Sequence, residues 1–124
     1  METGLYVLIG LLAAWFLYRQ FAPVKHLRTL NAEQFKSEAA AHRIIDVREA
    51  HEYKGGHIPG AVNMPLSVFG RRMNELSKDE PVYLYCQGGV RSKRAASQLS
   101  RSGYRQIAHL SGGIMSWRGP LQKK

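Results

Sequence analysis

One cysteine stands between the strongest strand signal of the chain and a helix that follows it. Cys86 comes directly after the β-type run Val82–Tyr85, and the pattern predicts a helix from Ser92. The loop between them consists of Gln87, Gly88, Gly89, Val90 and Arg91. Loops at the carboxyl ends of parallel strands bind ligands, and the N–H groups at a helix N-terminus attract anions. The spacing therefore predicts a site that binds negative charge at Cys86.

The thiol of Cys86 is the candidate nucleophile of this site. Gly88 and Gly89 allow the unusual dihedral angles of a tight loop. The helix dipole, the converging N–H groups and Arg91 each favour the thiolate over the thiol, and the loop would stabilise a covalent adduct. The alternative is a buried structural cysteine, which is the commoner role of a lone cysteine. The strand–Cys–Gly–Gly–Arg–helix arrangement favours the reactive thiol.

Alternating strands and helices must position this loop. The hydrophobic pattern predicts strands at 43–47, 61–64, 82–85 and 106–110. It predicts helices at 32–41, 49–53, 67–76 and 92–101, with a last turn at 113–117. Asn31 and Ser67 are the expected N-caps. Strands separated by helices favour an α/β fold with a small, mainly parallel sheet flanked by helices.

Composition excludes several classes of protein. Among 124 residues, 44% are hydrophobic and 22% are charged, which is unlike disordered or collagen-like chains. A single cysteine excludes an intramolecular disulfide, a two-cysteine redox pair and a multi-cysteine zinc site. The net charge of +9 is scattered without an aromatic-rich strand, so nucleic acid is not an expected partner. No metal site is predicted, because ligand spacing is absent at His26, His42, His51 and His109.

The N-terminal segment carries no charge from Thr3 to Tyr18. As a helix these 16 residues would be about 24 Å long, slightly less than the ~30 Å hydrocarbon core of a bilayer. Apolar residues continue as far as Val24 and could lengthen a short span. These features predict one transmembrane helix, with an anchor and linker at 3–24 that contact membrane lipid through residues 3–18.

The flanking charges decide between the alternatives for this segment. A cleaved signal peptide needs a positive leading segment, which is missing, and a buried core helix usually keeps a polar stripe. The positive-inside rule depends on basic residues that all follow the uncharged run, namely Arg19, Lys25 and Arg28. The prediction is a single-pass membrane protein whose C-terminal domain, residues 27–122, faces the cytoplasm.

Three segments, in chain order, resemble the signatures of the rhodanese family of sulfurtransferases. The first lies within residues 45–65, the second is the loop at 86–92, and the third is Leu110–Gly113 with Trp117. The resemblance covers nearly all of residues 27–122. It implies a rhodanese-like fold for this domain.

The resemblance also implies a reaction. Cys86 would accept a sulfane sulfur from a donor, hold it as a persulfide, and pass it to a thiol acceptor without metal or organic cofactor. The donor and the acceptor could each be a small molecule or a protein. The N–H groups of residues 87–91 would surround the persulfide, and Arg91 would attract an anionic donor. Arg48 and Glu52 are expected to flank the site, or to form with Asp46 an ion-pair network that fixes the loop. Ser92, at the end of the loop signature, is expected to support the site.

Loop length separates this interpretation from related cysteine phosphatases, which use Cys-x5-Arg. Here four residues separate Cys86 from Arg91, so the cradle is smaller and suits a single sulfur atom. Members that favour thiosulfate often carry basic residues after the cysteine, whereas Gln87 and Gly88 stand here, so thiosulfate is expected to be a poor donor. The alternative function is a non-catalytic docking or redox-sensing module at the membrane.

Overall fold

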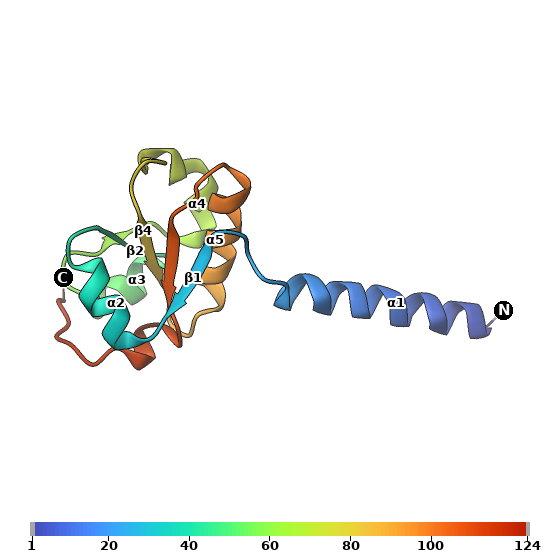
Figure 1. The fold of residues 1–124 in the computed structure, drawn as a ribbon. Helices are drawn as coiled ribbons and strands as arrows, with labels where there is room; N and C mark the ends of the chain where they lie inside the picture. Colours follow the sequence, from blue (N-terminus) through green and yellow to red (C-terminus); the bar gives the residue numbers. More distant parts are fainter. Residues whose placement is uncertain (1, 124) are drawn as a thin grey trace.

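The computed structural model describes residues 2–123 as a parallel sheet with helices on both faces and one helix that extends away from it (Figure 1). The five strands lie in the order β1-β5-β4-β2-β3, and every neighbouring pair is parallel. Their bounds are Leu27–Leu30 (β1), Arg43–Asp46 (β2), Val62–Asn63 (β3), Val82–Tyr85 (β4) and Ile107–Leu110 (β5). The predicted α/β fold with a parallel sheet is confirmed.

The helices connect these strands. The α-helices are α1 (Glu2–Phe21), α2 (Ala32–Ala39), α3 (Ala50–Lys54), α4 (Leu66–Arg72) and α5 (Val90–Arg101), and the 3₁₀ turns are η1 (Met73–Glu75) and η2 (Gly113–Ser116). The predicted N-cap Asn31 is confirmed, because its side chain accepts the Gln34 N–H at 2.8 Å. The predicted cap at Ser67 is wrong. Helix α4 begins after Pro65, and the Ser67 hydroxyl donates instead to the Glu49 carboxylate.

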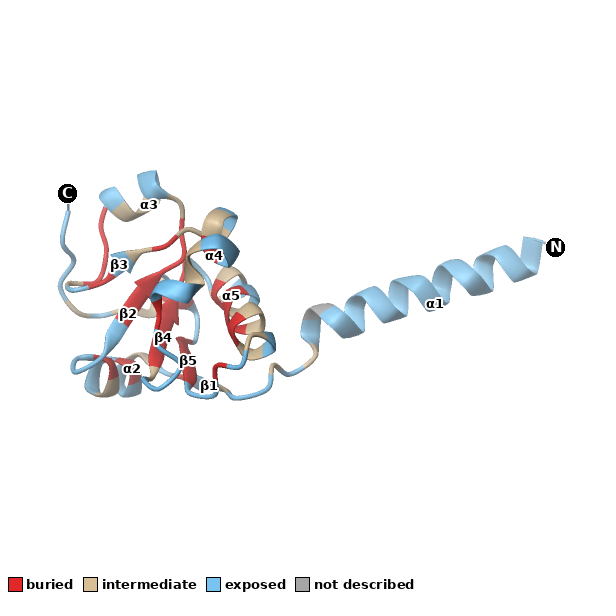
Figure 2. Ribbon diagram, turned by 90° about the horizontal axis from the view of Figure 1, so that it is seen from above, coloured by how far each residue is buried: buried red, intermediate tan, exposed pale blue. Residues whose placement is uncertain are grey.

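Strand β4 lies inside the sheet and is buried on both faces (Figure 2). Successive side chains of a strand point to opposite faces. Val82 and Leu84 therefore pack with α4 and α5 in one apolar cluster, whereas Tyr83 and Tyr85 pack with α2 in the other. The Phe35 ring of α2 meets both tyrosine rings edge-on, at centroid distances of 5.9 and 6.4 Å. This packing fixes the end of β4, where Cys86 follows.

Helix α1 corrects the membrane prediction. Within residues 2–123, no helix is long and apolar enough to cross a membrane. Helix α1 ends at Phe21, soon after Arg19, and Val24 packs against the apolar core beside α5 instead of lengthening the helix. The charged residues Glu2 and Arg19 lie inside this helix and limit its uncharged stretch to 16 residues, about 24 Å against the ~30 Å that a span requires. The predicted single-pass membrane localisation, with the C-terminal domain in the cytoplasm, is wrong, and the expected lipid contact through residues 3–18 loses its basis.

Candidate active site

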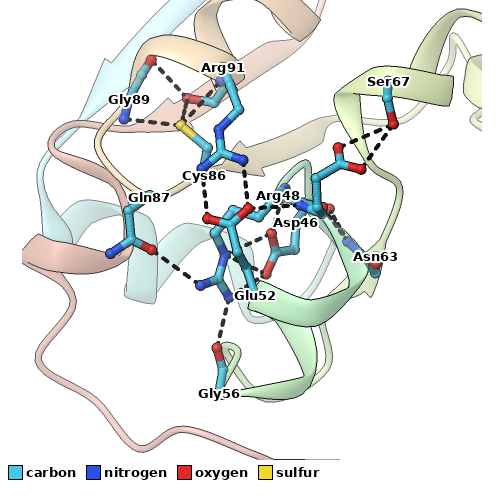
Figure 3. Close-up of polar contacts among 12 residues, drawn as sticks. Asp46, Arg48, Glu52, Gly56, Asn63, Ser67, Cys86, Gln87, Gly89 and Arg91 are labelled. Carbon is cyan, nitrogen blue, oxygen red and sulfur yellow. Dashed lines mark hydrogen bonds and ion pairs between the residues drawn. The ribbon is translucent and has the colours of Figure 1, made fainter.

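The Cys86 sulfur lies in a cradle of backbone N–H groups at the carboxyl end of β4 (Figure 3). The side chain is 1% exposed. Its Sγ accepts the N–H of Gly89 at 3.0 Å and the N–H of Ser92 at 3.3 Å. The N–H of Ser92 belongs to the first turn of α5, where backbone donors have no partner within the helix. Donors aimed at the sulfur from this position stabilise negative charge on it.

One glycine of the loop has the backbone conformation that the sequence predicted for two. Gly89 has φ = 109° and stands at the N-cap of α5, which begins at Val90. A side chain at this φ is strained, so glycine is required there. Gly88 does not have a positive φ, and a Cβ added to it would meet no atom within 4 Å. Of the two loop glycines, Gly89 is therefore the one that adopts a backbone conformation requiring glycine, and the expectation for Gly88 is wrong.

The C-terminal turn η2 holds the loop from behind. The N–H of Ile114 donates to the carbonyl of Cys86 at 2.8 Å, and the N–H of Met115 donates to that of Gln87 at 3.4 Å. Gly113 has φ = 63° and lies so close to these two carbonyl groups that a Cβ would overlap their oxygen atoms. Gly113, the last residue of the segment 110–113 that the resemblance marks, thus packs against the backbone of the cysteine loop, and the two residues that follow it bind that backbone.

A buried histidine stands behind the sulfur, and its part in the site was not predicted. His109 on β5 places Nδ1 2.8 Å from the Ser92 hydroxyl, which lies 3.6 Å from the Cys86 sulfur. On its other side, Nε2 is 3.2 Å from the hydroxyl of Thr29 on β1. The parallel pairing of β4 with β5 sets His109 opposite Leu84, two residues before Cys86. A prediction that β5 pairs with β4 in this register would have identified His109 as a residue of the site, because the pairing places it next to the cysteine loop.

The hydrogen bonds of this histidine indicate its protonation. The Ser92 hydroxyl donates to the Gly89 carbonyl at 3.1 Å, so it accepts from Nδ1–H of His109. In a neutral ring with the proton on Nδ1, Nε2 accepts from the Thr29 hydroxyl. Burial, together with the positive charge of Lys93, lowers the pKa of His109 and keeps it neutral at pH 7. The neutral ring holds Ser92 so that its N–H meets the sulfur.

Asp46 and Arg48 form a buried ion pair beside the loop. The Arg48 guanidinium donates Nη2–H to Asp46 at 2.8 Å, and the two side chains are 5% and 0% exposed. Nη2 also donates to the Gly56 carbonyl at 2.7 Å, and Nη1 donates to the Gln87 side chain at 3.3 Å. The pair thus connects the end of β2 with the first residue after Cys86.

The second ion pair joins α3 to α5. Nη1 and Nη2 of Arg91 donate to the two oxygens of the Glu52 carboxylate, at 2.6 and 2.9 Å. Hydrogen bonding from Arg91 lowers the pKa of Glu52 from its ordinary value of 4.5 to about 2, although partial burial opposes the shift. Of the residues predicted to support the site, the structure therefore places Asp46 with Arg48, Glu52 with Arg91, and Ser92 at the sulfur.

The Glu52 pKa predicts how this pair responds to acid. A carboxyl with a lowered folded-state pKa stabilises the fold above pH 4.5, and this contribution is lost as the pH falls towards 2. After discounting for partial exposure, we expect Glu52→Gln to lower the free energy of unfolding by about 1–2 kcal/mol at pH 7. Urea unfolding should show this difference shrinking below pH 4.5. The control Glu33→Gln, on an exposed helix face, should show little difference at any pH. A Glu52→Gln deficit that stays constant down to pH 2 would contradict the pair.

Two other polar ring side chains, His57 and Tyr85, make no hydrogen bond to the cysteine loop. The His57 ring stacks on Tyr53, and its Nδ1 is 3.0 Å from the Tyr53 carbonyl, so it serves the turn that follows α3. The Tyr85 hydroxyl accepts the Ile58 N–H at 3.0 Å in the core. Among residues 2–123, no three His, Cys, Asp or Glu side chains are placed to hold a metal ion.

Comparisons with known proteins agree with this arrangement. YqhL, an uncharacterized protein of Bacillus subtilis, is 44% identical over 111 residues, which cover 90% of this chain and 85% of YqhL. A sulfurtransferase of Allochromatium vinosum is 38% identical over 74 residues, covering 60% of this chain and 69% of that protein. The crystal structure of a rhodanese-related protein from Thermoplasma volcanium has a TM-score of 0.73 and 31% identity, covering 78% of this chain and 99% of that one.

The family itself is defined over most of the chain. The sequence model of the rhodanese-like domain matches residues 30–120, a range that contains strands β2 to β5 and the last residue of β1. It also contains the cysteine loop, both ion pairs and the C-terminal turn that supports the loop. The parallel sheet, the cradle at Cys86 and this match lead to one conclusion: the chain belongs to the rhodanese-like family.

Proposed function

We propose that the protein is a sulfurtransferase that carries a sulfane sulfur as a persulfide on Cys86. Membership of the rhodanese-like family and a relative named as a sulfurtransferase support a role in sulfur transfer. The observation that carries the finer proposal is the pair of N–H groups, from Gly89 and Ser92, that point at the Cys86 sulfur at 3.0 and 3.3 Å. A structural cysteine has no need of such donors, because apolar packing satisfies it.

The surrounding groups support the same role. The loop from Cys86 to Arg91 has exposed residues at 87, 88 and 90 around a buried sulfur, and we expect a second sulfur on Sγ to be stabilised by backbone N–H groups, as Sγ itself is by those of Gly89 and Ser92. Such amides act as fixed dipoles that stabilise an anion without reorganising. We assign Arg48 and Glu52 as positioning residues, since one donates to the side chain of Gln87 and the other binds Arg91.

Sulfur transfer proceeds in two steps that balance without an external oxidant or reductant. In the first, the Cys86 thiolate attacks the outer sulfur of a donor persulfide R–S–SH; the donor S–S bond breaks and R–S⁻ leaves. In the second, an acceptor thiolate attacks the outer sulfur of Cys86–S–SH, and the electron pair of that S–S bond returns to Cys86. No general base is needed once the thiolate is present, which agrees with a neutral His109 that contacts Ser92.

Mass spectrometry of the loaded protein tests this proposal. Incubation with an alkyl persulfide should add about 32 Da, one sulfur atom, to the intact chain. Cys86→Ser, which removes the one cysteine while keeping a similar side-chain size, should abolish the adduct, and a subsequent thiol should remove it from the wild type. Thiosulfate should load the protein more slowly, because Gln87 and Gly88 supply no positive charge beside the sulfur.

Two outcomes would overturn the proposal. A protein that takes up no sulfur from alkyl persulfide, inorganic polysulfide or thiosulfate would instead fit a non-catalytic docking module. An adduct that persists in a folded Cys86→Ser protein would place the sulfur elsewhere. Circular dichroism of both proteins shows whether the variant is folded.

A further inference from the structure

A groove of about 670 Å³ lies between the end of α1, the segment that follows it and the outer face of α5. Figure 2 shows this segment leaving α1 beside α5. The charged side chains that line the groove are all basic: Arg19, Lys25, Lys93, Arg94 and Arg101. Within residues 2–123, none of the five forms an ion pair, and no Asp or Glu lines the groove. Its positive charge is therefore available to a ligand.

Apolar side chains lie among these charges. Phe21 and Val24 line the groove on the side of the N-terminal segment, and Val90 lines it on the side of α5. The side chains of Phe21 and Val90 are exposed. A groove that combines cations with exposed apolar surface matches a ligand that has both negative and apolar groups.

One end of the groove is the cysteine loop itself. Gly89 and Val90 line the groove, and the Gly89 N–H is one of the donors that point at the Cys86 sulfur. From Val90 the lining residues follow one face of α5 through Arg94 and Ser97 to Arg101, at spacings of three and four residues. At 1.5 Å per residue, this face is about 17 Å long. The groove thus leads from the site along three turns of the helix.

We infer that this groove binds an acidic polypeptide segment whose cysteine accepts the sulfur from Cys86. The inference rests on the proposed function and names the class of its acceptor. The positive charges are spread along three turns of helix, which suits carboxylates spaced along a chain better than the compact charge of a small phosphate. Among the described residues, 2–123, Phe21 is the one aromatic side chain that lines the groove. Single-stranded nucleic acid is usually bound by several stacking rings, so the groove favours a polypeptide.

The transfer to this acceptor is the second step already described. A segment lying along α5 ends beside Gly89, so a cysteine at its leading end approaches the rim of the loop. Its thiolate attacks the outer sulfur of Cys86–S–SH, and the Cys86 thiolate leaves. The acceptor becomes a persulfide, and the protein returns to its starting state.

The test uses the full chain loaded with sulfur and two synthetic peptides of equal length. Each peptide has one cysteine, two leucines and five further residues that are all Glu in one and all Gln in the other. The rate of peptide persulfide formation, followed by mass spectrometry, should give the Glu peptide a roughly tenfold higher kcat/KM at low salt. This preference should fall as salt is added, because salt screens exposed charges.

Charge reversal locates the preference. Arg94→Glu/Arg101→Glu changes two exposed side chains of the groove and should reduce the Glu-to-Gln ratio to about one. The matched control, Lys36→Glu/Arg105→Glu, reverses two exposed charges outside the groove, so it changes the net charge equally and should keep the wild-type ratio. Differences in intrinsic reactivity between the two peptide thiols cancel when the ratio is compared between variants.

The outcomes separate this inference from the proposed function. If Cys86 takes up no sulfur, the proposed function fails. If it loads but the Glu-to-Gln ratio is one in the wild type, or falls equally in both double variants, only the groove assignment fails. Binding is also measured by fluorescence anisotropy with a single-stranded RNA of matched charge. Tighter binding of the RNA than of the Glu peptide, lost in the Arg94→Glu/Arg101→Glu variant, would assign the groove to nucleic acid.

Discussion

Asp46→Asn is expected to lower the free energy of unfolding by about 3–5 kcal/mol, the largest stability loss among the changes considered. The Asp46 carboxylate is fully buried and accepts three donors of Arg48: the backbone N–H, Nε–H and Nη2–H. An amide of the same shape leaves the guanidinium buried without its counter-charge. Urea unfolding at pH 7 measures the loss.

Two further variants distinguish this pair from an ordinary charge contact. Glu75→Gln breaks the Arg72–Glu75 pair, whose side chains are 37% and 51% exposed, and should cost far less stability than Asp46→Asn because solvent screens the pair. Asp46→Asn/Arg48→Met removes the unpaired charge and should recover part of the stability, which keeps the test informative if the single variant does not fold. Equal losses for Asp46→Asn and Glu75→Gln would show that the buried pair contributes no more than a surface one.

Gly113→Ala is expected to cost about 3 kcal/mol and to reduce sulfur loading of Cys86 severalfold. The cost combines a left-handed backbone, at φ = 63°, with overlap between the new Cβ and the carbonyl oxygens of Cys86 and Gln87. Relief of this overlap requires η2 and the loop to separate, which breaks the hydrogen bond from Ile114 to Cys86. Thermal unfolding measures the first effect and the yield of the 32 Da adduct measures the second.

Gly88→Ala is the matched control for this prediction. Gly88 belongs to the same loop, but its φ is not positive and a Cβ there would lie in open space. We expect its stability to stay within about 0.5 kcal/mol of the wild type and its loading to be unchanged. If Gly88→Ala were as damaging as Gly113→Ala, the loop would be sensitive to any added atom, and the contact with η2 would not explain the effect.

The parts of the fold that sequence predicts well are those decided by local pattern. Strand β4 was predicted with its observed bounds, because Val82–Tyr85 is buried on both faces and has no polar residue to interrupt the run. Helix α2 was predicted from the cap at Asn31, whose bonds are made within four residues. The cysteine loop was located for the same reason, since a strand, two glycines and a helix follow one another directly in the chain.

The parts that sequence missed depend on distant partners. Strand β1 has two exposed polar residues in a run of four and exists through its pairing with β5, so its own pattern is too weak to identify it. His109 looks like a packing residue until the register of β4 and β5 brings it to Ser92. The close approach of Gly113 to the loop likewise arises from tertiary packing.

The membrane prediction failed because the apolar residues beyond Arg19 do not lengthen the uncharged run. An uncharged run of 16 residues was extended, on apolar character alone, through residues as far as Val24. In the structure the helix stops at Phe21, and Val24 turns to the core beside α5. Hydrophobicity predicted the helix, whereas the charged residues Glu2 and Arg19 inside it limit its uncharged stretch to 16 residues.

The position of β5 has a consequence for the order in which the molecule is made. Leu27 of β1 pairs with Ile107 of β5, and the contact between Thr29 and His109 joins residues 80 positions apart. During synthesis β1 leaves the ribosome early, and it stays unpaired until most of the domain has been made and β5 has emerged. The loop at Cys86 waits as well, since its rear carbonyls are bonded by residues 114 and 115. In a nascent chain, therefore, the pairing of β1 with β5 and the completed backbone cradle at Cys86 both form late in translation.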